Sequence, residues 1–203
     1  MLDVGAPTDR GRDQGSDMNA IDLLIEQHRE TDELFDRFEQ TEDDDAKQAL
    51  ASEILVSLRM HTTIEEEIFY PAVRERVPDT EDDVLEGYEE HHAVELLLDE
   101  LEGMSPEDER FTAKTTVVIE LVRHHVEEEE DQLFPEVRES MGESVLSELG
   151  ERMAARAEEL LAGGGQDLTK EELYARAQEL DIAGRSQMSK RELIRAIGQA
   201  EAA

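Results

Sequence analysis

Apolar residues recur every three or four positions over four long stretches of this chain, which is the period of an α-helix with one buried face. The first stretch begins at Asn19 and ends ahead of the acidic run at 41–45. The second occupies residues 46–76 and ends before Pro78, and Pro71 is placed to kink it near its end. Two long amphipathic helices are therefore predicted for the first part of the chain.

Thr80 and Ser105 mark where two further helices are expected to start. Asp83 would complete a capping box with Thr80, and Ser105 is followed by a proline, a pair typical of a first helical turn. The positions expected to face inward are Leu85, Tyr88, His91, Leu98 and Leu101, then Val118, Leu121, Val122, His125, Glu129 and Leu133. Because the connections are short, the chain is predicted to be all-α, an antiparallel up-down four-helix bundle.

The chain beyond the bundle is expected to form a small helix-loop-helix appendage. A fifth helix at 143–161 and three glycines at 163–165 lead into two short helices, each introduced by a capping box, Thr169 with Glu172 and Ser189 with Glu192. The predicted organisation is a disordered tail at 1–18, the bundle at 19–142, a fifth helix with its linker at 143–167, and a helical module at 168–200.

The composition excludes several chemistries. Cys is absent, which removes disulfides, thiolate catalysis and iron–sulfur ligation and leaves His and carboxylates as the strong metal ligands. No apolar run long enough to span a bilayer and no secretory leader are found, so a cytoplasmic protein without a membrane partner is expected. The net charge of -34 disfavours nucleic-acid binding by the bundle, although residues 167–203 are nearly neutral, with 6 basic and 7 acidic side chains.

An internal repeat is the strongest chemical signal in the sequence. HTTIEEEIFYPAVRE at 61–75 aligns with HVEEEEDQLFPEVRE at 125–139, so His61 pairs with His125 and Glu65 with Glu129. Within each copy the Glu stands four residues after the His, which puts both on one helix face about 6 Å apart along the axis. One helix can therefore offer a nitrogen and a carboxylate to the same metal ion.

A looser echo relates the first and third predicted helices. EQHRETDELFDRF around His28 resembles EEHHAVELLLDEL around His91, with apolar residues at the sixth, seventh and tenth positions after each His. Each half of the bundle thus supplies one His helix and one His-x-x-x-Glu helix. A pseudo-twofold axis would bring four imidazoles and two carboxylates together, a ligand set that a pair of iron ions accepts.

These residues resemble the hemerythrin-like, or HHE cation-binding, family over residues 20 to about 140. The resemblance implies two iron ions in an oxo- or hydroxo-bridged centre that reacts with dioxygen, nitric oxide or peroxide. The ligands that it implies are His28, His61, Glu65, His91, His125 and Glu129. Manganese would accept the same ligands. Oxygen-carrying members have a second His where this chain has Glu95, which argues against reversible oxygen carriage.

Two of these histidines have a neighbour of the same type. Adjacent residues on a helix point about 100° apart, so only one of His91 and His92, and one of His124 and His125, can face inward. The helix patterns favour His91 and His125.

Two features near these histidines have simpler interpretations. Most carboxylates of the run at 127–131 are expected on solvated faces, with Glu129 set apart by its repeat partner. Tyr88, one turn before His91, is expected either beside the ligands or in the core.

Residues 167–198 resemble the helix-loop-helix module shared by the Rho-terminator N-terminal domain and SAP-type domains. The resemblance implies that two helices pack through Leu168, Leu173, Leu180, Leu193 and Ile197, and that the module binds nucleic acid or protein. The candidates for phosphate contacts are Lys170, Arg185, Lys190, Arg191 and Arg195. Because the module is nearly neutral and joined to an acidic bundle, a protein partner is as well supported as nucleic acid.

The function that these observations favour is a di-iron protein that senses or scavenges dioxygen, nitric oxide or peroxide, recruited to a target by the C-terminal module. An enzyme would use the same centre to turn over peroxide or nitric oxide at an open coordination position. An iron buffer or repair protein would load iron reversibly. The sequence leaves open whether the protein is an enzyme, and no separate catalytic residue stands out.

Overall fold

The computed structural model describes residues 18–162 and 170–188, together with 190, 193, 196, 197 and 200. These residues form helices and turns, and no strand occurs among them, so the all-α prediction is confirmed. The predicted tail up to residue 17, the glycine joint, and the predicted caps Thr169 and Ser189 lie outside the described residues. Within the described ranges, no helix is both long and apolar enough to cross a bilayer.

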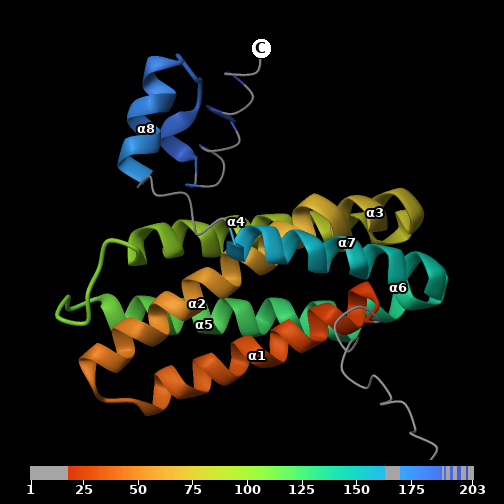
Figure 1. Cartoon of the computed structure of the whole chain (residues 1–203), viewed down its shortest axis with the longest axis horizontal. Helices are drawn as coiled ribbons and strands as arrows, with labels where there is room; N and C mark the ends of the chain where they lie inside the picture. Colours follow the sequence, from red (N-terminus) through yellow and green to blue (C-terminus); the bar gives the residue numbers. More distant parts are fainter. Residues whose placement is uncertain are drawn as a thin grey trace, which may run out of the picture.

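Four long helices form the bundle in two pairs (Figure 1). The first pair is α1 (Ala20–Gln40) and α2 (Asp44–Ile64), and the second is α4 (Glu81–Leu101) and α5 (Phe111–Glu128). Asn19 and Asp43 start the first two helices, because their side chains accept hydrogen bonds from backbone N–H groups of the first turn. The 3-10 turn η2 (Pro78–Thr80) connects the two halves.

The second helix of each pair is interrupted by a π-helical turn. These turns are η1 (Glu65–Phe69) and η3 (Glu129–Leu133), after which α3 (Tyr70–Arg76) and α6 (Phe134–Ser140) continue. Pro71 and Pro135 explain their place, since a proline has no N–H and its ring clashes with the carbonyl four residues earlier. The residue before each proline instead donates its N–H to the carbonyl five residues earlier, that of Glu65 or Glu129. Each π turn therefore begins at a predicted ligand.

One predicted helix start and one predicted capping box are wrong. α5 begins at Phe111 and not at Ser105, because Asp108 accepts hydrogen bonds from the Ser105 N–H and hydroxyl and closes this segment into a turn. Thr80 does precede α4, but its hydroxyl donates to the carbonyl of Val77, so the predicted capping box does not form.

The apolar core consists of two clusters with the predicted ligands between them. One cluster contains Leu24, Ile64, Val84 and Leu133, and the other contains Phe35, Leu58, Val94 and Val122. On every bundle helix the predicted site histidine lies between a residue of the first cluster and a residue of the second. Leu85 and Leu121, which were predicted to face inward, are exposed, and the adjacent Val84 and Val122 take the inward positions.

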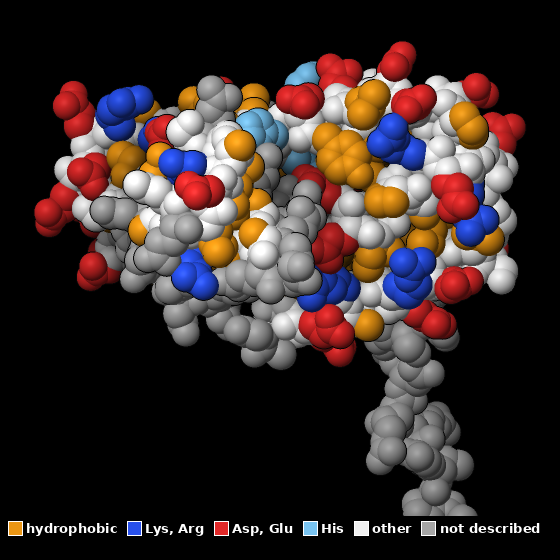
Figure 2. Space-filling model, turned by 90° about the horizontal axis from the view of Figure 1, so that it is seen from above, with side chains coloured by type: hydrophobic (Ala, Val, Ile, Leu, Met, Phe, Trp, Pro, Cys, Tyr) orange, Lys and Arg blue, Asp and Glu red, His pale blue; other side chains and the backbone are white. Residues whose placement is uncertain are grey.

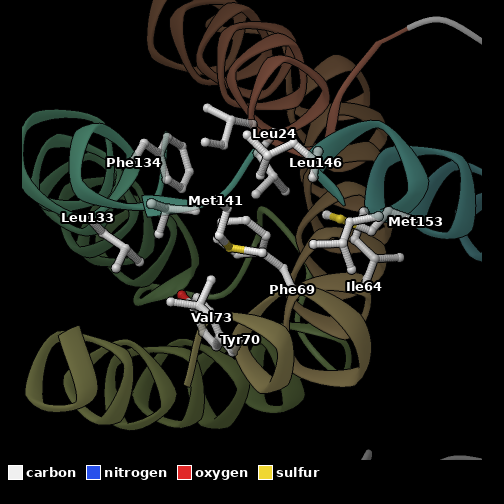
Figure 3. Close-up of a cluster of buried hydrophobic side chains, with 14 of the residues drawn as sticks. Leu24, Ile64, Phe69, Tyr70, Val73, Leu133, Phe134, Met141, Leu146 and Met153 are labelled. Carbon is white, nitrogen blue, oxygen red and sulfur yellow. The ribbon is translucent and has the colours of Figure 1, made fainter. Parts of the chain in front are cut away.

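The fifth helix, α7 (Glu143–Ala162), packs on α1, α2 and η1. Figure 3 shows its Leu146 and Met153 among the side chains of the first cluster, with Leu24 and Ile64. Gly150 lies where α7 meets the start of α1, and a Cβ at this position would be 2.3 Å from the carbonyl oxygen of Met18. Glycine is therefore required for this close approach.

The C-terminal module has a small core of its own around α8 (Lys170–Glu179). Leu173, Leu193 and Ile197 are buried and Leu180 is partly buried, whereas Leu168 lies outside the described residues. The loop after α8 contains η4 (Arg185–Gln187). Lys190 contacts the bundle, with its N–H 2.9 Å from an oxygen of Asp99 and its ammonium 2.7 Å from Glu102.

Candidate metal centre

Four histidines, one from each bundle helix, meet between the two apolar clusters. The Nε2 atoms of His28 and His61 are 3.2 Å apart, and those of His91 and His125 are 3.0 Å apart. All four side chains are buried. The structure turns His125 inward and leaves the side chain of His124 61% exposed, and it buries His91 while His92 is only half-buried.

Glu65 and Glu129 lie between the two histidine pairs. Glu65 Oε2 is 3.1 Å from Nε2 of His61 and 3.3 Å from Nε2 of His91. Glu129 Oε2 is 3.5 Å from Nε2 of His125 and 3.4 Å from Nε2 of His28. Each carboxylate therefore contacts one histidine of its own half and one of the other half. All six predicted residues are brought together, in the way expected of two carboxylates shared between two ions.

Three of the four oxygens of the two buried carboxylates lack a hydrogen bond. Both oxygens of Glu65 and Oε2 of Glu129 are buried with no partner, which is costly for an acceptor removed from water. Ligand atoms of His28, His61, Glu65 and Glu129 all lie within 4.8 Å of one another, as do those of Glu65, His91 and His125. A cation among these atoms would satisfy the carboxylates, and imidazole with carboxylate suits iron or manganese. The residues present therefore fit a pair of metal ions.

Each imidazole contacts a neighbouring side chain through its Nδ1 atom, which leaves Nε2 directed inward. The four Nδ1 contacts are His61 to Gln27 at 2.8 Å, His125 to Glu90 at 2.7 Å, His91 to Glu66 at 3.2 Å, and His28 to Glu130 at 2.8 Å. In three cases the partner is a carboxylate and in one it is an amide oxygen. The amide of Gln27 is oriented by its other end, which contacts the sulfur of Met60.

Sequence analysis missed these four partners. The halves nevertheless align at them, since Gln27 and Glu90 each precede a site histidine, and Glu66 and Glu130 each follow a site glutamate. Glu130 belongs to the run assigned to solvated faces, yet it contacts His28. The two halves therefore carry these four partners at matching positions.

Tyr70 is a further residue that sequence analysis missed. Its hydroxyl donates to Glu129 Oε1 at 2.8 Å, and its ring stacks on His91 with the ring centres 5.4 Å apart. Gly87 on α4 makes room for it, because a Cβ there would be 2.7 Å from the Tyr70 hydroxyl. Tyr88, for which two interpretations were open, packs edge-on against Tyr70 in the first apolar cluster.

The pKa values of Glu65, Glu129 and His61 are shifted in different directions. Burial, together with the charge on Glu129, raises the pKa of Glu65 well above its usual value. Burial acts in the same direction on Glu129, but the charges on His125 and His28 outweigh it and lower the pKa of Glu129. The pKa of His61 is lowered, by burial and by the charge on His28.

The side of the centre between α2 and α4 is closed by ion pairs. Glu95, the position where oxygen carriers have a further histidine, has its Oε1 3.3 Å from Nε of Arg59. Arg59 also donates to Asp99 at 2.9 Å and to Glu102 at 3.0 Å. Arg59 thus ties α2 to three residues of the next bundle helix and its end.

The opposite side, between α1 and α5, is open. A cavity of about 570 Å³ lies there and reaches all four site histidines. Charged side chains on α1 and α5 line it, among them Asp32, Arg123 and Glu127. Figure 2 shows acidic side chains scattered over the face of the molecule that it draws. A second, smaller cavity of about 50 Å³ lies near Tyr70 and Glu129.

Comparisons with known proteins agree with this geometry. Residues 19–137 match the family described as "Hemerythrin HHE cation binding domain", and residues 166–203 match "Rho termination factor, N-terminal domain". A protein named DNA nickase from Nostoc sp. is 30% identical over 138 residues, which are 68% of this chain but only 38% of that relative.

A solved structure has the same fold. It is a hemerythrin HHE cation binding domain-containing protein, the Rv2633c homologue from Mycobacterium kansasii, with a TM-score of 0.63 and 24% identity. The similarity covers 88% of this chain and 99% of that one. Together with the family match over more than half of the chain, the buried His and Glu cluster shows that this metal-binding protein belongs to the hemerythrin HHE cation-binding family.

Proposed function

We propose that this chain is a cytoplasmic, non-haem di-iron protein that senses or scavenges dioxygen, nitric oxide or peroxide. The proposed ligands are the six residues of the cluster, His28, His61, Glu65, His91, His125 and Glu129. The observation that carries the proposal is the convergence of four Nε2 atoms on two buried carboxylates with unpaired oxygens. Two positive ions would remove the cost of burying those carboxylates.

Bound iron would supply an open coordination position and electrons for reaction with a small oxidant. The protein's own residues would do the rest. The Nδ1 contacts orient the imidazoles, and Arg59 closes one side. Leu58, Val94 and Val122 present apolar surface toward the open side and limit the water that reaches the centre.

The first test is the iron content and visible spectrum of the purified protein, before and after anaerobic reduction and exposure to air. We expect about two irons per chain and the charge-transfer band of an oxo-bridged pair. His125→Ala should lose both, whereas the adjacent His124→Ala, whose side chain is 61% exposed, should keep them. No iron after loading, or equal loss in the two variants, would reject the proposal.

Turnover distinguishes the roles that such a centre can have. An enzyme consumes many equivalents of peroxide or nitric oxide when a reductant is supplied, and His61→Ala abolishes this activity. A sensor or stoichiometric scavenger changes its spectrum once for each centre. An iron buffer exchanges iron with a chelator and shows no reaction with either oxidant.

A second candidate is a role at DNA, alone or through a protein partner. It is favoured by the similarity to a DNA nickase and by the match to the Rho termination factor domain. The net charge of -34 acts against it, because an acidic bundle repels phosphates. Supercoiled plasmid incubated with iron- or manganese-loaded protein tests it. Intact plasmid and no gel shift at low salt would reject it, and nicking lost in His61→Ala would tie it to the metal centre.

A further inference from the structure

The cavity between α1 and α5 is far larger than a diatomic gas or hydrogen peroxide requires. Its volume is about 570 Å³, whereas one molecule of liquid water occupies about 30 Å³. Pockets for organic ligands measure about 300 to 1,000 Å³. The size therefore leaves room for a larger ligand in front of the histidines.

The cavity has the four site histidines at one end and an apolar wall. The apolar wall consists of Ile25, Phe35, Leu58, Val94, Val122 and Val126. Thr31, Thr62 and charged side chains such as Glu90 and Glu127 line the rest of the cavity. Water against the apolar wall would contact hydrocarbon that offers it no hydrogen bond, so a ligand with its own hydrocarbon group fits the wall better.

Charged residues of α1 and α5 form ion pairs beside the mouth of the cavity. Arg123 on α5 donates to Asp32, Asp36 and Glu39 on α1, at 2.8, 3.0 and 3.1 Å. The same guanidinium lies 5.8 Å from the ring centre of Phe35, which belongs to the apolar wall. These ion pairs join α1 and α5 beside the cavity.

We propose that this cavity binds an organic hydroperoxide with a compact aromatic or branched hydrocarbon group. The inference rests on the proposed function and names its substrate class. The oxygen atoms face the histidines and the hydrocarbon group lies against the wall. Cleavage of the O–O bond would consume two electrons, which a reduced pair of irons held by the six residues would supply, and two protons from solvent, and it would yield an alcohol and water.

Binding can be tested without turnover, on the full chain with and without iron. The probe is 2-phenyl-2-propanol, the alcohol that cumene hydroperoxide leaves, and calorimetry reports its affinity. Val122→Phe and Val94→Phe place a ring in the cavity from two different helices and should weaken binding at least tenfold. Val117→Phe is the matched control, since this residue is 43% exposed on the same helix as Val122 and lies outside the cavity.

Turnover provides the second readout. The reduced, iron-loaded protein should react faster with cumene hydroperoxide than with hydrogen peroxide. Val122→Phe should slow the reaction with cumene hydroperoxide about tenfold more than the reaction with hydrogen peroxide, whereas Val117→Phe should leave both rates unchanged. If the alcohol does not bind, or binds equally well to folded Val122→Phe and Val94→Phe, the inference is wrong. If the chain loads no iron, the proposed function fails, while alcohol binding to the metal-free chain still decides whether the cavity is an organic binding site.

Discussion

The two halves of the metal centre have the same ligands in different surroundings. Tyr70 of the first half stacks on His91, and Phe134, its counterpart in the repeat, stacks on His28 with the ring centres 5.8 Å apart. Only Tyr70 has a hydroxyl, and it donates to Glu129. Glu65, related to Glu129 by the repeat, has no donor for either oxygen.

The residues of α4 and α1 near these two rings differ in size. Gly87, four residues before His91, leaves space for the Tyr70 hydroxyl. Leu24, four residues before His28, is a fully buried side chain of the first apolar cluster, which also contains Phe134. The repeat therefore keeps the six proposed ligands and varies the residues around them, so the two metal positions that we propose should differ chemically.

The largest expected effect tests the part that the halves share. Glu65→Ala and Glu129→Ala should each reduce the iron content from about two per chain to one or none, because each carboxylate contacts a histidine of both pairs. Metal analysis after anaerobic loading measures this. Glu67→Ala is the control, since Glu67 pairs with Arg156 at the surface. Full loading of one of the two variants would show that the carboxylates are not equivalent bridges.

Gly87→Ala tests the space for the Tyr70 hydroxyl, which only one half of the centre provides. The new Cβ would approach the Tyr70 hydroxyl to 2.7 Å, and such overpacking should lower the free energy of unfolding by about 2 kcal/mol. In a Tyr70→Phe background the cost should fall by about 1 kcal/mol, because the clashing atom is gone. Denaturant unfolding of the four proteins in this cycle gives the coupling. Strictly additive costs would mean that the glycine serves another purpose.

The side chains that contact Nδ1 of the histidines differ in charge. Exchanging a carboxylate for an amide, or the reverse, should change the iron affinity in opposite directions, and these effects are smaller than those above. Glu90→Gln should weaken iron binding about tenfold, since a carboxylate acceptor makes the imidazole of His125 a stronger donor to metal. Gln27→Glu should strengthen iron binding, through His61. Competition with a chelator measures both affinities. A change in the same direction for both variants would show that the charge of the acceptor is not what matters.

The sequence predicted the six residues of the buried His and Glu cluster because the motif occurs twice. His61 and His125, each with a glutamate one turn later, fix the register of two helices, and burial of the matching histidines on α1 and α4 follows from helical periodicity. What the sequence analysis missed depends on contacts between helices. The role of Tyr70 requires Gly87, 17 positions away, and Ser105 resembles a helix cap until Asp108 is seen to close the turn.

The π turns fall between these cases. Pro71 was predicted to kink its helix, whereas no distortion was predicted at Pro135. Each distortion is a wider turn that starts at Glu65 or Glu129. Its position depends on which carbonyl the proline ring must avoid. Because a proline in a long helix can instead cause a bend, the sequence alone does not predict the π turn. The cavity likewise depends on how far α1 and α5 separate, which no local pattern records.

The smallest expected effect isolates the Tyr70 hydroxyl. Tyr70→Phe removes the donor to a buried carboxylate oxygen of Glu129 and should lower the free energy of unfolding of the metal-free protein by about 1 kcal/mol. Because the ring remains, its stacking on His91 and the iron content should persist, while the visible band of the loaded protein should shift. The reciprocal Phe134→Tyr meets Leu24 where Tyr70 meets glycine, so it should destabilise the protein without producing that shift. If both variants shift the band alike, the hydroxyl on one side does not make the metal positions unequal, and the asymmetry is one of packing alone.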